Sequence, residues 1–329
     1  MESTSSENIS ANFSERFREL RNAISGVILG QERVVDDLLV AVLARGHVLI
    51  EGAPGLGKTR LVRAFAEATD LDFGRIQFTP DLMPADVTGT TVFVEESGDR
   101  RFEFQRGPVF TNVLLADEIN RATPKTQAAL LEAMQERAVT AAGTRHELPD
   151  PFVTLATQNP LEMEGTYPLP EAQLDRFLFK VLIDRPDSET LKRILITTTG
   201  NEETVLSPMF RRGELLELQR VVRAVLMASA ALEKVVELVE ASHRHPLLRL
   251  GASPRGAQAI TLAAKGYALA AGRPNVEIED VRRAAHPALR HRLLLSFEAE
   301  VDGVRPDSII DDLLEQVTGA QRRGRTVRQ

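Results

Sequence analysis

The sequence of 329 residues contains no cysteine and no tryptophan, and only two tyrosines. The absence of cysteine excludes thiolate nucleophiles, iron–sulfur clusters, cysteine-ligated zinc and a disulfide framework. The shortage of aromatic rings leaves few platforms on which single-stranded nucleic acid could stack. No apolar run approaches the roughly 18 residues of a membrane-spanning helix, and the polar first residues do not resemble a secretory signal. We therefore expect a protein without a membrane span, located in the cytoplasm.

Acidic residues outnumber basic residues by 47 to 40, which gives a net charge of −7. Proteins that grip the backbone of nucleic acid are usually basic, so this balance disfavours nucleic acid as the main partner. Only six of the basic residues are lysines, whereas 34 are arginines. A lysine inside a chemical motif is therefore a specific signal in this chain.

The order of the hydrophobic patterns predicts an α/β domain followed by an all-α domain. Residues 1–12 are rich in Ser, Asn and Glu and are expected to be disordered, while residues 13–188 alternate short apolar runs with amphipathic stretches. Strands that alternate with helices indicate a parallel sheet covered on both faces. Residues 189–329 are dominated by helical patterns, which we take as a second domain.

The elements expected from these patterns are as follows. Strands are predicted at 47–51, 75–78, 113–116, 152–157 and 177–183, and hairpins at 90–104 and 138–148. Helices are predicted at 13–25, 31–45, 59–69, 124–136, 189–197, 214–241, 255–271 and 277–290.

A glycine-rich loop follows the first predicted strand. The segment Gly52-Ala53-Pro54-Gly55-Leu56-Gly57-Lys58-Thr59 fits the pattern G-x-x-x-x-G-K-[ST] between a predicted strand and a predicted helix, the context that this motif needs. Its glycines let backbone N–H groups converge on phosphate oxygens, and the helix start adds a positive dipole. Lys58 would reach the β- and γ-phosphates, the Thr59 hydroxyl would bind Mg²⁺, and Arg60 completes the nucleotide-binding segment. The motif predicts a site for ATP and Mg²⁺.

A second motif is an apolar strand that ends in two carboxylates. Val113 to Ala116 is followed by Asp117 and Glu118. Asp117 can hold the hydration shell of Mg²⁺, and Glu118 can polarise a water molecule for in-line attack on a phosphate. Two solvated loop acids would be the ordinary interpretation of this pair alone, but its position downstream of the glycine-rich loop favours a hydrolase.

Three further residues lie where a nucleotide hydrolase could use them. Asn159 follows a predicted strand, at the edge where ligands bind in open α/β sheets, and could orient the attacking water. It could equally cap the turn before Pro160. Arg176 precedes the last predicted strand and Arg255 begins a helix, and either could place a cation at the γ-phosphate. A surface salt bridge is the alternative for any single arginine.

The order of these motifs resembles that of an AAA+ ATPase. Longer blocks resemble the MoxR family, in the helix-2-insert clade related to the ATPase subunits of magnesium chelatase. These blocks are Gly30-Gln31-Glu32, Asp81 to Asp86, Gly107 to Phe110, Leu114 to Glu136, Thr157 to Pro160, Gly165 to Phe177 and Gly251 to Arg255. The resemblance extends over nearly the whole chain beyond residue 12.

The resemblance implies a sheet of strand order 5-1-4-3-2, a helical lid from about residue 189, and ATP bound between the two. It implies that Asn159 is sensor 1 and that Arg176 is the arginine finger presented to the next subunit. Arg255 would be sensor 2, and whether it acts in its own subunit or in a neighbour stays open.

The family pattern also assigns the remaining segments. Val27, Ile28 and Gly30 would lie near the adenine, and the hairpins at 90–104 and 138–148 would be the helix-2 insert and the pre-sensor-1 insert. The chain would hydrolyse ATP to ADP and phosphate in a homo-oligomeric ring, expected to be hexameric. It would act as a chaperone-like motor in the assembly of protein complexes or the insertion of metal cofactors.

The resemblance further implies a partner protein with a von Willebrand factor A (VWA) domain, whereas the client protein is not indicated. The alternative function is a motor that acts on nucleic acid, of the helicase or restriction type. The acidic charge balance and the scarcity of aromatic residues disfavour this alternative.

Overall fold

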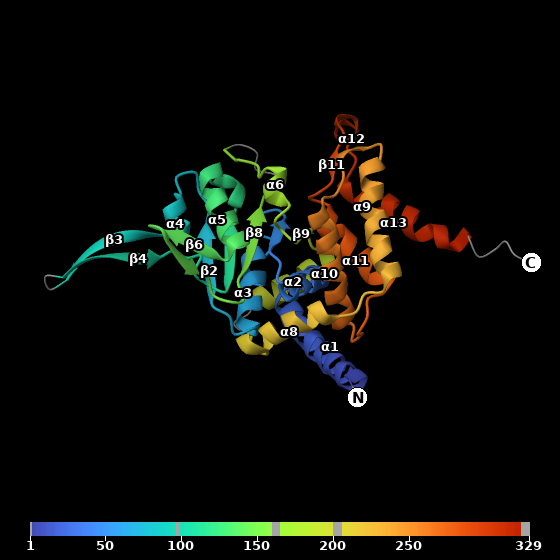
Figure 1. The fold of residues 1–329 in the computed structure, drawn as a ribbon, viewed down its shortest axis with the longest axis horizontal. Helices are drawn as coiled ribbons and strands as arrows, with labels where there is room; N and C mark the ends of the chain where they lie inside the picture. The colour runs from blue at the N-terminus through green and yellow to red at the C-terminus, as the bar shows by residue number, and fades with distance from the viewer. Residues whose placement is uncertain (1, 97–98, 160–164, 200–205, 324–329) are drawn as a thin grey trace, which may run out of the picture.

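The structure is a computed structural model that describes residues 2–96, 99–159, 165–199 and 206–323. A five-stranded parallel sheet lies at the centre of the first domain, in the order β2-β5-β8-β1-β9 (Figure 1). Its strands are β1 (Val48–Glu51), β2 (Phe73–Gln77), β5 (Val113–Asp117), β8 (Val153–Gln158) and β9 (Phe179–Leu182). When these five strands are numbered in chain order, the arrangement is 5-1-4-3-2, which confirms the expected topology.

Helices cover both faces of this sheet because its strands are apolar on both sides. Successive residues of β1 point to opposite faces, so Val48 and Ile50 pack into one core cluster and Leu49 into the other. The first cluster includes residues of α1 (Glu2–Val27), α2 (Glu32–Leu43) and α3 (Lys58–Ala68). The second includes residues of α4 (Pro84–Thr88) and α5 (Pro124–Glu136). The predicted α/β architecture is therefore confirmed.

Two hairpins extend from the first domain, as predicted. The strands β3 (Gly89–Glu96) and β4 (Asp99–Arg106) pair over their whole length and project away from the body of the molecule (Figure 1). The turn expected at 97–98 lies outside the described residues. The shorter hairpin joins β6 (Ala138–Ala141) to β7 (Thr144–Glu147) around Gly143.

The second domain consists mainly of helices. These are α7 (Ser188–Thr198), α8 (Arg212–Ala224), α9 (Ser229–Arg244), α10 (Pro254–Ala270), α11 (Ile278–Leu289), α12 (Phe297–Val301) and α13 (Pro306–Arg323). The domain also contains a small antiparallel sheet of β10 (Leu248–Leu250) and β11 (Leu294–Leu295), so the prediction that it is all-α is wrong in this detail. The two strands are too short to produce a periodic signal in the sequence.

The structure corrects two further expectations. The backbone is helical from Glu2, where disorder was expected through residue 12. Phe13, Phe17, Leu20 and Ile24 anchor one face of α1 in the core, and extending an anchored helix costs less than starting one. The helix predicted over 214–241 is interrupted between α8 and α9. The N–H of Leu226 donates to the carbonyl of Pro274 at 3.1 Å, so the chain pairs there with a distant segment instead of continuing the helix.

The two domains share part of their core at α2 and α10. The Tyr267 hydroxyl donates to Oδ1 of Asp37 at 2.6 Å, and burial raises the pKa of both groups. This contact joins the helix before β1 to a helix of the second domain. Among the described helices, none has both the length and the apolar composition that a membrane span requires.

Candidate active site

The glycine-rich loop connects β1 to α3 at the carboxyl end of the sheet. Gly55 and Gly57 have φ of +80° and +81°, a left-handed conformation that other residues adopt only with strain. Gly52 is required for a different reason, since a Cβ there would lie 2.9 Å from the carbonyl oxygen of Ile183. The loop therefore has a backbone geometry for which its glycines are needed.

The loop also holds its lysine in place. Lys58 begins α3, is buried, and donates from Nζ to the carbonyl oxygen of Gly52 at 2.7 Å. Thr59 and Arg60 follow in the first turn of α3 and are partly exposed. The helix start, the ammonium group and the glycine-rich loop together provide what a polyphosphate needs: positive charge and N–H donors.

The carboxylate pair ends the strand β5. Asp117 is buried, and its Oδ1 accepts a hydrogen bond from the Thr157 hydroxyl at 2.7 Å. Glu118 has the left-handed backbone conformation, with φ of 56°, and its N–H donates to Thr157 Oγ1 at 2.9 Å. Thr157, at the end of β8, therefore holds both residues, a role that inspection of the sequence missed.

The side chain of Glu118 is held by two donors. Its Oε2 accepts from Gln77 Nε2 at 2.7 Å and from Arg121 Nη1 at 3.0 Å. Arg75 contacts the other carboxylate, with Nη2 at 2.7 Å from Oδ2 of Asp117. Arg75 and Gln77 were not identified from the sequence. The sequence does indicate that Gln77 ends a strand. It does not indicate that this strand lies beside β5, and the contacts with the two carboxylates depend on that pairing.

Asn159 lies directly after β8, the strand between β1 and β5, and is buried. The structure therefore brings Asn159 to the same sheet edge as the glycine-rich loop and the carboxylate pair. Pro160, which the turn-capping alternative involves, lies outside the described residues.

The segment assigned to the adenine lies where α1 and α2 meet the start of the second domain. Val27 and Ile28 are buried in the core. Gly30 has φ of +73°, and a Cβ there would lie 2.5 Å from Thr190 Cγ2 in α7. Gln31 Nε2 donates to the carbonyl oxygen of Asp184, just beyond β9, at 3.1 Å. Asp184 follows the carboxyl end of β9, and β9 is a neighbour of β1 in the parallel sheet. This junction therefore lies at the same edge of the sheet as the glycine-rich loop.

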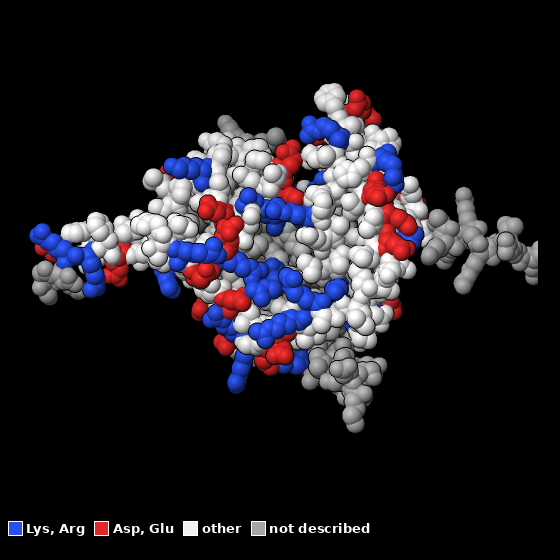
Figure 2. Space-filling model, in the orientation of Figure 1, with Lys and Arg blue, Asp and Glu red and all other residues white. Residues whose placement is uncertain are grey.

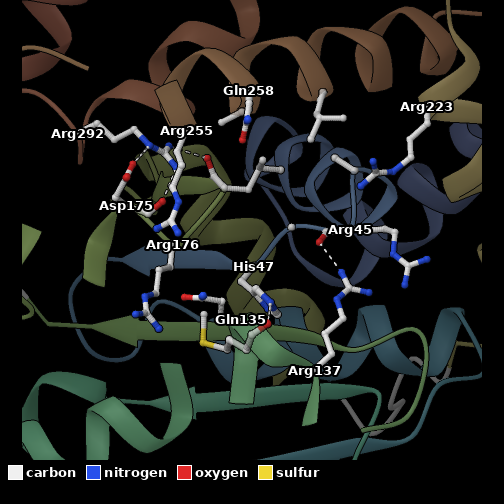
Figure 3. A pocket seen from close by; sticks show the side chains of 16 residues that line it. Arg45, His47, Gln135, Arg137, Asp175, Arg176, Arg223, Arg255, Gln258 and Arg292 are labelled. Atoms are coloured by element: carbon white, nitrogen blue, oxygen red, sulfur yellow. Dashed lines mark hydrogen bonds and ion pairs between the residues drawn. The ribbon is translucent and has the colours of Figure 1, made fainter. Parts of the chain in front are cut away.

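Arg176 and Arg255 lie together, but in a different place. Both line a cavity of about 290 Å³ between the two domains, on the same side of it in Figure 3. Six arginines of the described part of the chain line this cavity: Arg45, Arg137, Arg176, Arg223, Arg255 and Arg292. In the view of Figure 2, basic side chains gather near the middle of the molecule, where the two domains meet in Figure 1.

This cavity lies at the amino end of β1, where Gly46 and His47 form part of its lining. The glycine-rich loop begins at Gly52, beyond the other end of the strand. At about 3.3 Å per residue, the backbone from His47 to Gly52 spans about 16 Å. The structure therefore forms two groups, with Lys58, Asp117, Glu118 and Asn159 at one edge of the sheet and Arg176 and Arg255 at the other.

The carboxyl edge of the sheet fits Mg²⁺ by its donor chemistry. Thr59 and Asp117 supply a hydroxyl and a carboxylate, the hard oxygen donors that Mg²⁺ prefers. Within the described residues, no group of three or more His, Cys, Asp or Glu side chains could hold a metal ion. Few protein ligands are typical of Mg²⁺ bound mainly through water and substrate phosphates.

Comparison with known proteins shows two matching family models. Residues 47–179 match the ATPase family associated with various cellular activities (AAA), and residues 240–313 match the AAA lid domain. The two matches lie in the first and the second domain, respectively. They include the glycine-rich loop, the carboxylate pair, Asn159, Arg176 and Arg255.

Relatives of similar length cover most of the chain. It is 44% identical to YeaC of Bacillus subtilis, an uncharacterised protein, over 89% of this chain and 92% of the relative. It is 42% identical to chaperone MoxR1 of Mycobacterium tuberculosis, over 89% of this chain and 80% of the relative. Protein MoxR of Paracoccus denitrificans is 36% identical, over 85% of this chain and 89% of the relative.

A solved structure has the same fold. The crystal structure of a proposed ATPase from Cytophaga hutchinsonii superposes with a TM-score of 0.88 at 38% sequence identity. The match covers 96% of this chain and 98% of that one.

Proposed function

The chain belongs to the MoxR family of AAA+ ATPases and is an ATP hydrolase, and from this premise we propose that it works as a homo-oligomeric ring in which neighbouring copies share each ATP site. One observation carries this proposal. Arg176 and Arg255 line a cavity at the amino end of β1, about 16 Å along the strand from the loop that would bind ATP. Two cations at the opposite end of β1 from their own phosphate site suit the phosphates of another copy.

Within one copy, residues at the carboxyl edge of the sheet bind ATP and activate the attacking water. The glycine-rich loop and Lys58 bind the phosphates of ATP, and Val27, Ile28 and Gly30 lie beside its adenine. Thr59 and Asp117 would hold Mg²⁺, which when bound neutralises charge on the phosphate oxygens. Glu118 accepts a proton from the attacking water, and Asn159 orients that water.

The neighbouring copy completes the site. Its Arg176 places positive charge against the γ-phosphate as negative charge develops there, and its Arg255 acts in the same place. Sensor 2 therefore acts in trans in this proposal. A single copy would then hydrolyse ATP poorly, and assembly would control the rate.

The work done with ATP is proposed to be remodelling of another protein. The name of the relative chaperone MoxR1 supports this, as does the projecting β3–β4 hairpin, on which Phe93 and Phe102 are exposed. We further propose a hexameric ring, a VWA-domain partner, and a role in assembling complexes or inserting metal cofactors. The cytoplasm is the proposed location, since a chain free of cysteine suits a reducing compartment.

The ring is tested by the ATPase rate per chain as a function of protein concentration, with light scattering to measure mass. We expect the rate per chain to rise steeply over the concentration range in which the mass rises. A rate per chain that stays constant while the protein remains monomeric would disprove the shared site. Co-purification with a VWA-domain protein in ATP, in ADP and in a non-hydrolysable analogue tests the partner.

A further inference from the structure

An arginine of β2 contacts the carboxylate that is expected to face the metal ion. β2 pairs in parallel with β5, with Arg75 opposite Leu115 and Gln77 opposite Asp117. Alternate residues of a strand point to the same face, so Arg75 and Gln77 extend from the same side of β2. Arg75 Nη2 donates to Oδ2 of Asp117 at 2.7 Å and to Oε1 of Gln77 at 2.7 Å.

These bonds use both oxygens of Asp117. Its Oδ1 accepts from the Thr157 hydroxyl, and its Oδ2 accepts from Arg75. The Asp117 side chain is only 12% exposed, and a buried carboxylate without a partner is costly. Arg75 therefore supplies the counter-charge that Asp117 needs when no metal ion is bound.

The same arginine also orients the amide of Gln77. Because Gln77 Oε1 accepts from Arg75, its Nε2 is turned toward Glu118, where it donates to Oε2 at 2.7 Å. An unbroken series of hydrogen bonds thus runs from Asp117 through Arg75 and Gln77 to Glu118.

We propose that Arg75 is a positioning residue that competes with Mg²⁺ for Asp117. This inference rests on the proposed function. Arg75 has to leave Oδ2 before that oxygen can turn toward a metal ion, and its side chain, 47% exposed, has solvent to turn into.

Competition predicts an effect of opposite sign to that of simple structural support. If Arg75 only supported the site or attracted phosphate, removing its charge would weaken binding of the Mg²⁺–nucleotide complex. If Arg75 competes for Asp117, the substitution Arg75→Gln tightens that binding and leaves binding without Mg²⁺ unchanged. We expect tightening of about 1.5- to fivefold, the range for loss of one partly exposed ion pair.

The experiment titrates the full-length chain with a fluorescent ATP analogue, with Mg²⁺ and with excess EDTA, and follows the Mg²⁺ concentration needed for half-maximal binding. Arg75→Gln should lower that concentration, and Arg75→Lys, which keeps the charge, should retain most of the wild-type value. Arg63→Gln is the matched control. Its guanidinium lies over the ring of Phe73, 5.9 Å from the centroid, at the other end of β2.

Weaker or unchanged Mg²⁺-dependent binding in Arg75→Gln would overturn the competition, as would an equal tightening in Arg63→Gln. Thermal unfolding of each variant shows whether the substitution has damaged the fold. A wild-type chain that does not bind the analogue under either condition would instead disprove the proposed nucleotide site.

Discussion

Arg292 of the second domain donates from Nε to Oδ1 of Asp175 in the first domain at 2.7 Å. The guanidinium is almost entirely buried, and burial lowers the pKa of Arg292 while the bond to Asp175 opposes that effect. Ser253 Oγ donates to the same carboxylate, at 2.9 Å from Oδ1 and 3.0 Å from Oδ2. Asp175 immediately precedes Arg176, and Ser253 lies two residues before Arg255. One carboxylate therefore sets the relative position of the two arginines proposed to act on a neighbouring copy.

Replacing this carboxylate should destabilise the protein. Asp175→Asn leaves Arg292 buried without its counter-charge, which costs about 3–5 kcal/mol for a buried pair. Urea denaturation should show this loss of unfolding free energy, and adding Arg292→Met should recover part of it. Glu189→Gln is the control, because Glu189 forms an exposed pair with Lys192 at 3.8 Å, worth less than about 1 kcal/mol. A loss no larger than that of the control would contradict the role of Asp175.

Mixing two inactive variants should restore activity. Lys58→Ala removes phosphate binding from its own copy but keeps Arg176, whereas Arg176→Ala keeps an intact phosphate site. If each site is shared, a mixture contains some sites with both groups intact, and each regains an arginine worth about 10³ to 10⁵ in rate in GTPases. The measurement is release of phosphate by each variant and by an equimolar mixture.

The control for this experiment is a mixture of Lys58→Ala with Glu118→Gln. Both substitutions lie at the carboxyl edge of the sheet, but in different copies, so no intact phosphate site with its base can form at either variant copy. Activity restored in both mixtures would point to contamination by active protein instead of shared sites. No restoration in the first mixture would count against the shared site.

Glu118→Gln should separate hydrolysis from binding. The amide keeps the size of the side chain but cannot accept a proton, so turnover should fall by about 10² to 10⁴. Affinity for ATP should stay within a few-fold of wild type, because Lys58 and the glycine-rich loop are intact. Single-turnover hydrolysis and equilibrium binding measure the two effects. An equal loss of both would show that Glu118 supports binding instead of acting as the base.

Stability should depend on pH through His47. Its Nδ1 accepts from the Thr154 N–H at 2.9 Å and its Nε2 lies 3.2 Å from the Met134 carbonyl oxygen, so the ring is neutral with the proton on Nε2. Complete burial, and then the charge of Arg137, lower the pKa of His47 to about 4. Because the folded-state pKa is depressed, the stabilisation is complete above the unfolded value of 6.5 and is lost as the pH falls from 6.5 toward 4.

The expected slope from His47 is up to about 1.4 kcal/mol per pH unit in this range. His291 is buried as well, and its pKa is lowered well below 6.5, so it should add to the same slope. His47→Gln keeps a donor and an acceptor without a titrating group, and should therefore make the slope shallower. Urea denaturation at several pH values measures this, and identical slopes in the two proteins would contradict a buried neutral His47.

The groups at the carboxyl edge of the sheet could be predicted because their signals are local. The glycine-rich loop and the Asp117–Glu118 pair are contiguous motifs beside short apolar strands, and the structure places both at strand ends. Asn159 follows a strand in the same way. The strand order came from resemblance to a family, since no local pattern states which strands are neighbours.

Several missed features depend on segments far apart in the chain. Arg75 and Gln77 reach the two carboxylates only because β2 pairs with β5. The break between α8 and α9 depends on pairing of Leu226 with the segment around Pro274. The pair β10–β11 depends on loops that helices bring together.

The amino-acid sequence by itself determined the local motifs of this protein: a glycine-rich loop, a strand that ends in two carboxylates, and the alternation of strands and helices. These follow from contiguous residues, whose backbone preferences act over a few positions. Only the tertiary structure decided that Arg176 and Arg255 lie at the opposite end of β1 from that loop, that Asp175 and Arg292 join the domains beside them, and that Arg75 contacts Asp117. Such relationships are set by the packing of a whole sheet and its helices, where each position depends on residues throughout the chain.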